Sequence, residues 1–246
     1  MRVLGVVPAR LGSTRLPHKP LQLLAGEPLV TRVIQRVSSF GAVDELVVAT
    51  DSPMVAEVAE RSGVRAVLTR DTHLSGTERV AEVASRPEFA DFELIANVQG
   101  DEPFLPEAAL AGAIARVRGG DDIGTAAAPL DPAEAADPAR VKVVLDAEDR
   151  ALYFSRAAIP YHRADAPVPE AYLQHLGLYV YTRAALARWV AAPPPAAELM
   201  ELLEQLRALH CGLRIGVARL AEAAPPGIDT PDDLRRAERH WHHSHG

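Results

Sequence analysis

The sequence contains a single cysteine, Cys211, among its 246 residues. An intramolecular disulfide is therefore excluded, and so is a metal site built from several thiolates. No apolar stretch reaches the length of a membrane-spanning helix, and the apolar part of residues 1–8 is too short for a signal peptide. One cysteine and no export signal favour a cytoplasmic protein without membrane insertion. Positive charge is also in deficit: the net charge of −7 disfavours nonspecific binding to nucleic acid.

Two common nucleotide-binding motifs are absent as well. No Gly-x4-Gly-Lys-Ser/Thr sequence occurs, which excludes a Walker A phosphate loop. No Gly-x-Gly-x2-Gly sequence follows the first expected strand, which argues against a reductase with a dinucleotide fold. There is no internal repeat, and the three prolines at 193–195 predict only a short rigid connector between helices.

What the sequence does contain is an alternation of apolar runs and amphipathic segments. In the first part we expect strands at 3–7, 46–49, 66–68 and 94–98 and helices at 28–37, 53–60, 77–84 and 106–117. The second part is less regular, with expected strands at 141–145 and 178–181 and helices at 199–209 and 231–240. This order predicts parallel βαβ units with helices on both faces of the sheet. Since no linker separates the halves, we expect one α/β domain over 1–246, built on a single mixed, mostly parallel sheet flanked by helices.

A basic loop follows the first expected strand. It carries Arg10, Arg15 and Lys19, with the hydroxyl of Ser13 between them and a glycine that permits a tight turn. Ligands of such sheets bind beyond the carboxyl ends of the strands, so the loop is placed to hold a triphosphate. Charged loops are common, and a merely solvated loop explains the composition about equally well.

Two aspartates are candidates for a metal site. Asp101 comes just after the fourth expected strand, where a carboxylate can bind a hard cation; an ordinary Gly-Asp turn is the simpler explanation. Asp229 precedes a predicted helix start in which Thr230 is the cap, the next residue is proline and Asp233 is the acid at the third position. The capping pattern leaves Asp229 without a structural task.

Other polar residues have structural explanations of equal or greater weight. Ser75 and Glu78 fit a capping box, and the free amides of that helix start can also meet a phosphate. Glu204 and Gln205 fit the solvated face of the helix expected at 199–209. Cys211 has no paired base and fits packing better than catalysis. The histidine-rich end from 240 onward fits a disordered tail better than a metal site.

Taken together, nine segments resemble one family, that of the 3-deoxy-manno-octulosonate (KDO) cytidylyltransferases, also called CMP-KDO synthetases. The segments occur in order at 10–20, 49–51, 75–79, 97–103, 141–144, 153–160, 175–179, 203–207 and 229–234. The resemblance covers nearly the whole chain. It implies a nucleotide-diphospho-sugar transferase (Rossmann-like) fold, a homodimer, and a sugar-binding and dimerisation part roughly within 130–210.

The resemblance also implies roles for individual residues. Those expected at the nucleotide are Arg10, Ser13, Arg15, Lys19, Ser75, Thr77 and Gln99. Those expected around the sugar acid are Gln99, Arg156, Arg163, His175, Tyr179, Glu204 and Gln205. Asp101 and Asp229 are expected to hold Mg²⁺, and with Lys19 they form the expected catalytic set. The segment 161–171, which contains Arg163, departs most from the family pattern.

The implied reaction transfers CMP from CTP to the anomeric hydroxyl of KDO, releases pyrophosphate and supplies lipopolysaccharide biosynthesis. Such chemistry needs positioning and charge neutralisation more than covalent help, which suits a cation loop and a metal. Two alternatives stay open at this point. One is a cytidylyltransferase for a related acidic sugar, such as 8-amino-KDO or a sialic acid. The other is a noncatalytic nucleotide-binding module, which the presence of both aspartates disfavours.

Overall fold

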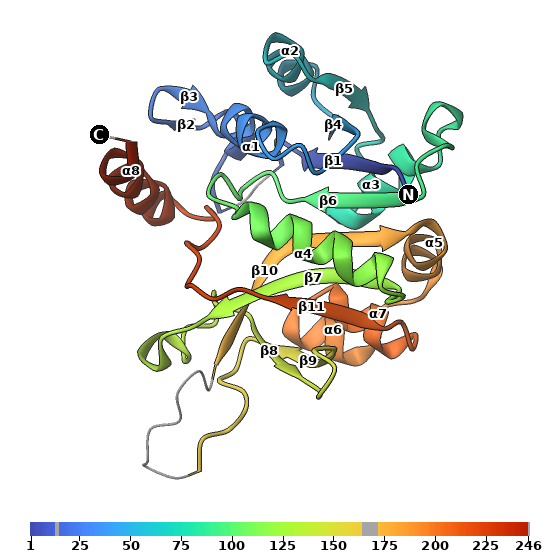
Figure 1. Cartoon of the computed structure of the whole chain (residues 1–246). Helices are drawn as coiled ribbons and strands as arrows, with labels where there is room; N and C mark the ends of the chain where they lie inside the picture. Colours follow the sequence, from blue (N-terminus) through green and yellow to red (C-terminus); the bar gives the residue numbers. More distant parts are fainter. Residues whose placement is uncertain (13–14, 164–171, 246) are drawn as a thin grey trace. The chain divides into compact units, whose positions relative to one another are not determined.

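The structure is a computed structural model that describes residues 1–12, 15–163 and 172–245, without the side chains of 243–245. Its contacts group into two compact units, shown in Figure 1. The first unit comprises residues 1–105 and 225–246, and the second comprises 106–224. The expectation of one domain over 1–246 stays a prediction.

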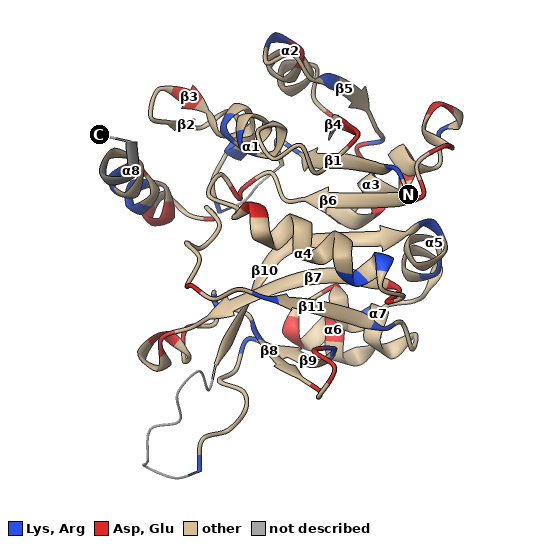
Figure 2. Cartoon of the chain, viewed as in Figure 1, with Lys and Arg blue, Asp and Glu red and all other residues tan. Residues whose placement is uncertain are grey.

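The first unit is built on a parallel sheet. Its strands lie in the order β6 (Leu94–Val98), β1 (Val3–Ala9), β4 (Glu45–Thr50) and β5 (Arg65–Leu68). In Figure 2, β1 and β6 are drawn entirely in tan because they carry no charged residue. Every residue of β6 is buried, as expected for a parallel strand covered on both faces.

Three helices connect these strands by right-handed crossovers: α1 (Leu29–Ser38), α2 (Pro53–Arg61) and α3 (Gly76–Ala84). The strand order places α1 and α2 on one face and α3 on the other, which Figure 1 shows. The hydroxyl of Ser52 caps α2 by accepting from the Val55 amide at 3.4 Å. Apart from η2 (Pro87–Phe89), the chain then runs from α3 into β6 without another helix among the described residues.

A small satellite core joins the two ends of the first unit. The hairpin of β2 (Leu23–Leu24) and β3 (Glu27–Pro28) lies beside α8 (Pro231–His245), and the short helix η1 (Lys19–Leu21), which precedes the hairpin, contacts α1. Buried apolar side chains hold them together: Leu16, Leu24, Leu29, Ile228 and Ala237. The guanidinium of Arg32 lies 4.3 Å above the ring of Trp241 and seals this contact. The loop before η1 is thereby fixed against the segment that leads into α8.

The second unit contains a mixed sheet. Its strands are β7 (Ile123–Pro129), β8 (Lys142–Leu145), β9 (Ala151–Ser155), β10 (Leu173–Thr182) and β11 (Ile215–Arg219). β11 pairs with β7 in parallel, and the pairs β7/β10, β10/β8 and β8/β9 are antiparallel. The helical elements are α4 (Glu107–Arg118), η3 (Pro132–Glu134), α5 (Arg183–Ala191), α6 (Ala196–Glu201) and α7 (Gln205–His210).

The α/β class, the mostly parallel pairing and the flanking helices are confirmed. The helix expected over 199–209 is wrong, because the chain breaks at Leu202, whose φ of 52° is left-handed. Leu202 is also 75% exposed rather than packed, whereas Leu203 and Leu206 are buried as expected. The break separates α6 from α7 and leaves Glu204 at the start of α7. The disordered tail is wrong too, because α8 continues to His245.

Candidate functional site

Lys19 stands at the first position of η1, and its ammonium bridges two carboxylates. Nζ donates to Asp101 Oδ2 and, over 2.8 Å, to Asp229 Oδ1. The preceding residue, His18, adopts a left-handed conformation with φ of 54°, which turns the chain into η1. The side chain of Lys19 is only 15% exposed. The sequence predicted all three residues as the catalytic set, and the structure brings them together.

Asp101 owes its place to the contact between two neighbouring strand ends. β1 and β6 run in parallel, so the loops that follow them meet at one edge of the sheet. Gly100 makes the approach possible: a Cβ there would lie 2.9 Å from the Pro8 carbonyl oxygen, which no other residue tolerates. The carbonyl of Asp101 accepts from the Ile228 amide at 2.9 Å. This bond ties the loop after β6 to the segment that carries Asp229.

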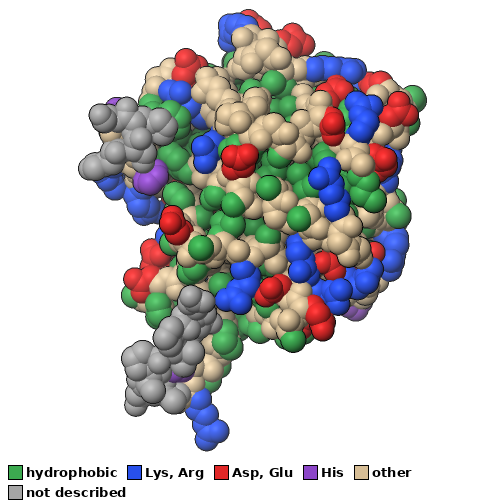
Figure 3. Space-filling model, viewed as in Figure 1, with side chains coloured by type: hydrophobic (Ala, Val, Ile, Leu, Met, Phe, Trp, Pro, Cys, Tyr) green, Lys and Arg blue, Asp and Glu red, His purple; other side chains and the backbone are tan. Residues whose placement is uncertain are grey.

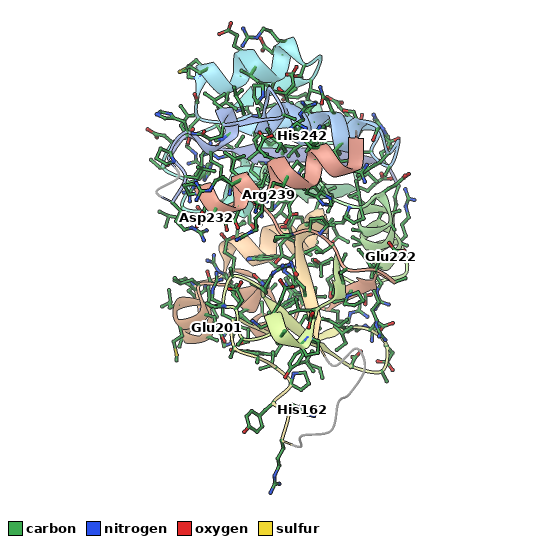
Figure 4. All side chains as sticks on the ribbon, turned by 90° about the vertical axis from the view of Figure 1, so that its left-hand side faces the viewer. His162, Glu201, Glu222, Asp232, Arg239 and His242 are labelled. Atoms are coloured by element: carbon green, nitrogen blue, oxygen red, sulfur yellow. The ribbon has the colours of Figure 1, made fainter. Side chains whose placement is uncertain are left out.

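Asp229 is held by the cap of α8. Thr230 Oγ1 accepts from the Asp233 amide at 3.2 Å, and Asp233 Oδ2 accepts from the Thr230 amide at 2.8 Å. Asp233 also accepts from the Asp229 amide at 3.1 Å, and these bonds lower the pKa of the Asp233 carboxyl against the effect of its partial burial. The capping box is confirmed. Figure 4 shows the same first turn of α8, where Asp232 is labelled. The cap does not use the carboxylate of Asp229, which instead forms ion pairs with Lys19 and with Arg15. The Nη2 of Arg15 lies 3.0 Å from Asp229 Oδ2.

The cluster of Arg15, Lys19, Asp101 and Asp229 is electrically balanced, with two positive and two negative charges. Burial acts to lower the pKa of Lys19, but the charges and hydrogen bonds of the two aspartates outweigh it, so the pKa is raised. Lys19 therefore stays protonated. Arg15 is 64% exposed and is the outermost member.

The other predicted nucleotide residues surround the same edge of the first unit. Arg10 follows β1 and is exposed, and Ser13 lies outside the described residues. Ser75 Oγ caps α3 by accepting from the Glu78 amide at 3.2 Å, and Glu78 accepts from the Leu74 amide. A Cβ on Gly76 would lie 3.4 Å from Pro8 and 3.8 Å from Gln99 Oε1. The start of α3 thus lies beside the ends of β1 and β6, with Thr77 buried beneath it.

A buried ion pair that the sequence reasoning missed holds α3 in this position. Arg79 is 2% exposed; its Nη2 donates to Asp51 Oδ2 at 2.7 Å and its Nη1 donates to Thr69 Oγ1. Asp51 follows β4, and Thr69 follows β5. Both Asp51 and Arg79 stand inside the family segments at 49–51 and 75–79, which was the available signal.

The second unit contains two more of the predicted sugar residues in one aromatic cluster. The rings of His175 and Tyr179 lie 5.3 Å apart, and Phe154 meets His175 edge-on at 4.9 Å. Thr125 Oγ1 donates its only proton to the Leu178 carbonyl at 2.6 Å. His175 Nε2, 2.9 Å from the same oxygen, must therefore be the donor, which leaves Nδ1 as an acceptor.

Both residues of this pair are uncharged. Burial lowers the pKa of His175 to about 3, so its imidazole is neutral near pH 7. Burial raises the pKa of Tyr179 well above its usual range, and the neighbouring Tyr181 and Glu204 add to the effect. His175 can accept a hydrogen bond from a sugar hydroxyl through Nδ1, but it supplies no positive charge for a carboxylate.

Arg156 is engaged by the protein itself. Its Nε donates to the Glu201 carbonyl at 2.7 Å, its Nη1 to the Pro138 carbonyl at 2.9 Å, and its amide to Glu201 Oε2 at 2.9 Å. Figure 4 labels Glu201, at the end of α6. Arg163 is exposed at the edge of the described residues.

Glu204 and Gln205 lie at the start of α7, where Gln205 is 5% exposed. The structure therefore brings His175, Tyr179 and Glu204 together and places Arg156 in a separate hydrogen-bond group. None of these contacts tests the sugar-binding roles, which stay predictions.

The donor set of the first unit fits magnesium. Among the described residues, no group of three or more His, Cys, Asp or Glu side chains converges on a point. Magnesium suits the pair of carboxylates formed by Asp101 and Asp229, because it binds one or two protein carboxylates and completes its shell with water and phosphate oxygens. Asp101 and Asp229 already share one cationic partner, the ammonium of Lys19, so both carboxylates reach a common point.

The surface carries charges of both signs, and Figure 3 shows acidic and basic side chains interspersed on one face. No described helix is both long enough and apolar enough to cross a bilayer.

Comparison with known proteins places these features in a family. A family model described as cytidylyltransferase matches residues 4–215. The 3-deoxy-manno-octulosonate cytidylyltransferase of Gemmatimonas aurantiaca is 56% identical over 245 residues, with 98% of this chain and 95% of that protein covered. The enzyme of the same name from Methylococcus capsulatus is 49% identical over 246 residues, covering 96% and 95%.

Solved structures agree with the sequence matches. One described as CMP:2-keto-3-deoxy-manno-octonic acid synthetase complexed with CTP has a TM-score of 0.91 and 35% identity, covering 99% of this chain and 100% of that one. A putative glucose-1-phosphate thymidylyltransferase from Bacillus anthracis, at 13% identity and a TM-score of 0.67, is similar in fold alone. Because identity above one half extends over almost its whole length, this chain belongs to the 3-deoxy-manno-octulosonate cytidylyltransferase family.

Proposed function

We propose that this chain transfers CMP from CTP to the anomeric hydroxyl of KDO, giving CMP-KDO and pyrophosphate for lipopolysaccharide biosynthesis. The observation that carries the proposal is the convergence of Lys19, Asp101 and Asp229 beyond the carboxyl ends of a parallel sheet. In the reaction, the anomeric oxygen forms a bond to the α-phosphorus and loses its proton. The bond from the α-phosphorus to the bridging oxygen breaks, and pyrophosphate leaves with that oxygen.

The described residues supply charge and position for this reaction. Arg15 and Lys19 are cations on the loop after β1, where they neutralise the triphosphate and the charge that grows on the leaving pyrophosphate. The amides at the start of α3, which the Arg79–Asp51 pair fixes, point toward the same sheet edge and suit a phosphate or a base. Arg10, Ser13, Ser75, Thr77 and Gln99 complete the proposed nucleotide set.

The cofactor of this proposal is Mg²⁺, held by Asp101 and Asp229. When bound, the ion would neutralise phosphate charge and lower the pKa of a hydroxyl next to it. The two side chains fit this task because each keeps a carboxylate oxygen within reach of one shared cation, the ammonium of Lys19. A separate general base is therefore not required of the protein.

Activity is tested by incubating the protein with CTP, KDO and Mg²⁺ and measuring pyrophosphate. We expect release only when all three are present. Parallel reactions with 8-amino-KDO and with a sialic acid test the related sugars, and we expect KDO to give the highest kcat/KM. Absence of release with every 2-keto-3-deoxy acid would contradict the enzymatic function and leave a nucleotide-binding module.

The metal ligands are tested by a double-mutant cycle on turnover. Asp101→Asn and Asp229→Asn each keep the shape and remove the charge, so each should abolish most turnover. Because both carboxylates act on one ion, the double variant should lose scarcely more than either single variant. Strictly additive losses, or normal magnesium dependence of Asp229→Asn, would show that the two residues share no metal.

We further propose a cytoplasmic homodimer. The cytoplasmic location is supported by the single cysteine. The dimer is supported by apolar side chains on the surface of the second unit: Leu152, Tyr153, Leu199, Met200 and Leu202, which are 39% to 84% exposed. The exposed residues of β9 lie near those of α6 and Leu202, because a hydrogen bond joins the ends of the two elements: Ser155 Oγ donates to Glu201 Oε1 at 2.6 Å. Exposed apolar patches of this kind often mark protein–protein contacts.

Light scattering at micromolar concentration tests the dimer, and Met200→Glu is expected to give a monomer. As a matched control, Met54→Glu replaces another exposed methionine, 59% exposed on α2 of the first unit, and should leave the dimer intact. A wild-type protein that is monomeric throughout would contradict the proposal.

A further inference from the structure

The ammonium of Lys19 occupies the point that the two proposed metal ligands share. It bonds to Asp101 Oδ2 and to Asp229 Oδ1, and both carboxylates lie on segments tied together by the Ile228–Asp101 backbone bond. The lysine is 15% exposed and Asp101 is 22% exposed, so water competes weakly with this contact. A divalent cation bound to both carboxylates would need the same oxygen atoms.

We propose that Lys19 is an internal counter-ion that occupies the metal position in the nucleotide-free protein and leaves it when a triphosphate binds. The divalent cation then enters with the nucleotide rather than before it. This inference rests on the proposed function, because it takes Asp101 and Asp229 as the metal ligands.

Charge balance explains why the exchange depends on the nucleotide. Without a ligand, the cluster of Arg15, Lys19, Asp101 and Asp229 is neutral, so an arriving divalent cation would meet two positive charges with no excess of negative charge. A nucleoside triphosphate brings about four negative charges at neutral pH. These give Lys19 new partners and make room at the carboxylates for the metal.

The choice of side chain fits this role. Lys19 and Lys142 are the only lysines among the 26 basic residues of the sequence. An arginine would grip each carboxylate through a rigid planar fork, whereas lysine is a compact point charge on a flexible stem. A point charge can substitute for a metal ion and can turn to a phosphate without a change in the backbone of η1.

Metal binding without nucleotide provides the first test. Mn²⁺ affinity is measured by electron paramagnetic resonance for the wild type, Lys19→Gln and Arg15→Gln. Both variants remove one positive charge that contacts Asp229, but only Lys19→Gln vacates the shared point. We expect Lys19→Gln to bind Mn²⁺ about tenfold or more tightly than the wild type, and Arg15→Gln to change the affinity by only a few-fold. No gain in Lys19→Gln, or an equal gain in both variants, would overturn the proposal.

The second test follows the lysine itself. In protein labelled with ¹³C-lysine, only two Cε signals are expected, and Lys19→Gln identifies the one from Lys19. Mg²⁺ at a concentration that saturates the nucleotide complex should leave the Lys19 signal unchanged when added alone. Mg²⁺ with a nonhydrolysable CTP analogue should shift it and leave Lys142 unchanged. Displacement of Lys19 by Mg²⁺ alone at that concentration would overturn the proposal.

A third variant separates failure of this inference from failure of the metal site. Asp101→Asn in the Lys19→Gln background should lose the gained Mn²⁺ affinity. If the gain persists in the double variant, Mn²⁺ binds elsewhere and both proposals fail. If the aspartate cycle on turnover behaves as expected while Lys19→Gln gains nothing, the metal site stands and the counter-ion role alone is wrong.

Discussion

The two lysines of this chain stand in different units and have different kinds of partner. Lys19, in the first unit, bonds to two carboxylates that remain partly exposed. Lys142, in the second unit, has no exposed surface and donates to three backbone carbonyls: Asp137 at 3.0 Å, Arg140 at 2.5 Å and Arg156 at 2.6 Å. The pKa of Lys19 is raised, whereas burial lowers the pKa of Lys142 against the opposing effect of Asp137.

The difference shows how the same side chain forms a reversible contact in one place and a structural contact in the other. A carboxylate that loses its lysine can bind a metal ion instead, and a lysine that loses its carboxylate can bind a phosphate instead. The contact of Lys19 with its two aspartates is therefore reversible. The backbone carbonyls that bond to Lys142 belong to the fold, so Lys142 has no metal ion or phosphate to exchange with at this contact. Lys142 therefore fastens the loop at 137–140 to the backbone of Arg156.

The largest expected effect separates the two lysines by activity. Lys19→Met should lower kcat by about 100- to 1,000-fold, because it removes charge stabilisation at the leaving pyrophosphate. The free energy of unfolding should change by less than about 1 kcal/mol, since Asp229 keeps Arg15 as a partner and both carboxylates keep partial access to water. Pyrophosphate release and urea unfolding measure the two quantities. A loss of stability as large as the loss of activity would break the comparison.

The same substitution at the other lysine should act on stability. Lys142→Met removes the side-chain donor of the Arg140 and Arg156 carbonyls and one of the two donors of the Asp137 carbonyl, and we expect the free energy of unfolding to fall by about 2–3 kcal/mol. Urea denaturation with an unchanged m-value would measure it. Lys19→Met is the matched control. If Lys142→Met unfolds at the wild-type urea midpoint, the carbonyl contacts contribute nothing to the fold.

A pH experiment sharpens the contrast by asking how the second unit treats another buried basic side chain, the imidazole of His175. The pKa of His175 is lowered from 6.5 to about 3 by burial. Above pH 6.5 the imidazole is neutral in both the folded and unfolded states. As pH falls from there toward 3, only the unfolded state binds the proton, so stability falls by up to about 1.4 kcal/mol per pH unit.

This contribution is measured by urea unfolding near pH 7 and near pH 5 for the wild type and His175→Gln. We expect the wild type to lose about 1–2 kcal/mol more than the variant over this interval. Identical pH slopes would mean that His175 titrates normally in the folded protein.

The smallest effect concerns the cap next to Asp229. Thr230→Ala removes the hydroxyl that caps α8 and should lower the free energy of unfolding by about 1 kcal/mol. Thr230→Ser keeps the hydroxyl and should behave as the wild type. Thermal unfolding measures both. A 100-fold loss of turnover in Thr230→Ala without a change in Tm would show that the first unit uses Thr230 in the reaction itself.

The first unit was the easier half to predict from sequence. β6 has the predicted bounds 94–98, and α1, α2 and α3 begin within one residue of the expected positions. These elements have regular apolar periodicity and clear start signals, such as Ser52 before Pro53 and Ser75 before Gly76. Local chemistry was sufficient to define them.

The second unit was harder to predict, because β7 consists mostly of small residues. β7 reads Ile-Gly-Thr-Ala-Ala-Ala-Pro, a composition of low strand propensity from which no strand was expected. The structure gives the reason: a Cβ on Gly124 would lie 2.0 Å from the Ala113 carbonyl oxygen, so α4 packs directly on the strand backbone. The packing of α4 on the strand explains that composition, and the residues of the strand alone do not reveal it. β9, β11 and α5 were missed as well.

The sequence by itself determined which residues could do the chemistry, because cations, carboxylates and helix caps are local properties. It marked Lys19, Asp101 and Asp229 as candidates and explained Thr230 as a cap. Tertiary structure decided that these three side chains share one point, although 128 positions separate the two aspartates. It also decided that Arg156 bonds to backbone carbonyls and that His175 is neutral. The physical reason is that distance, burial and hydrogen-bond partners depend on strands and loops brought together from distant parts of the chain, and no local pattern records them.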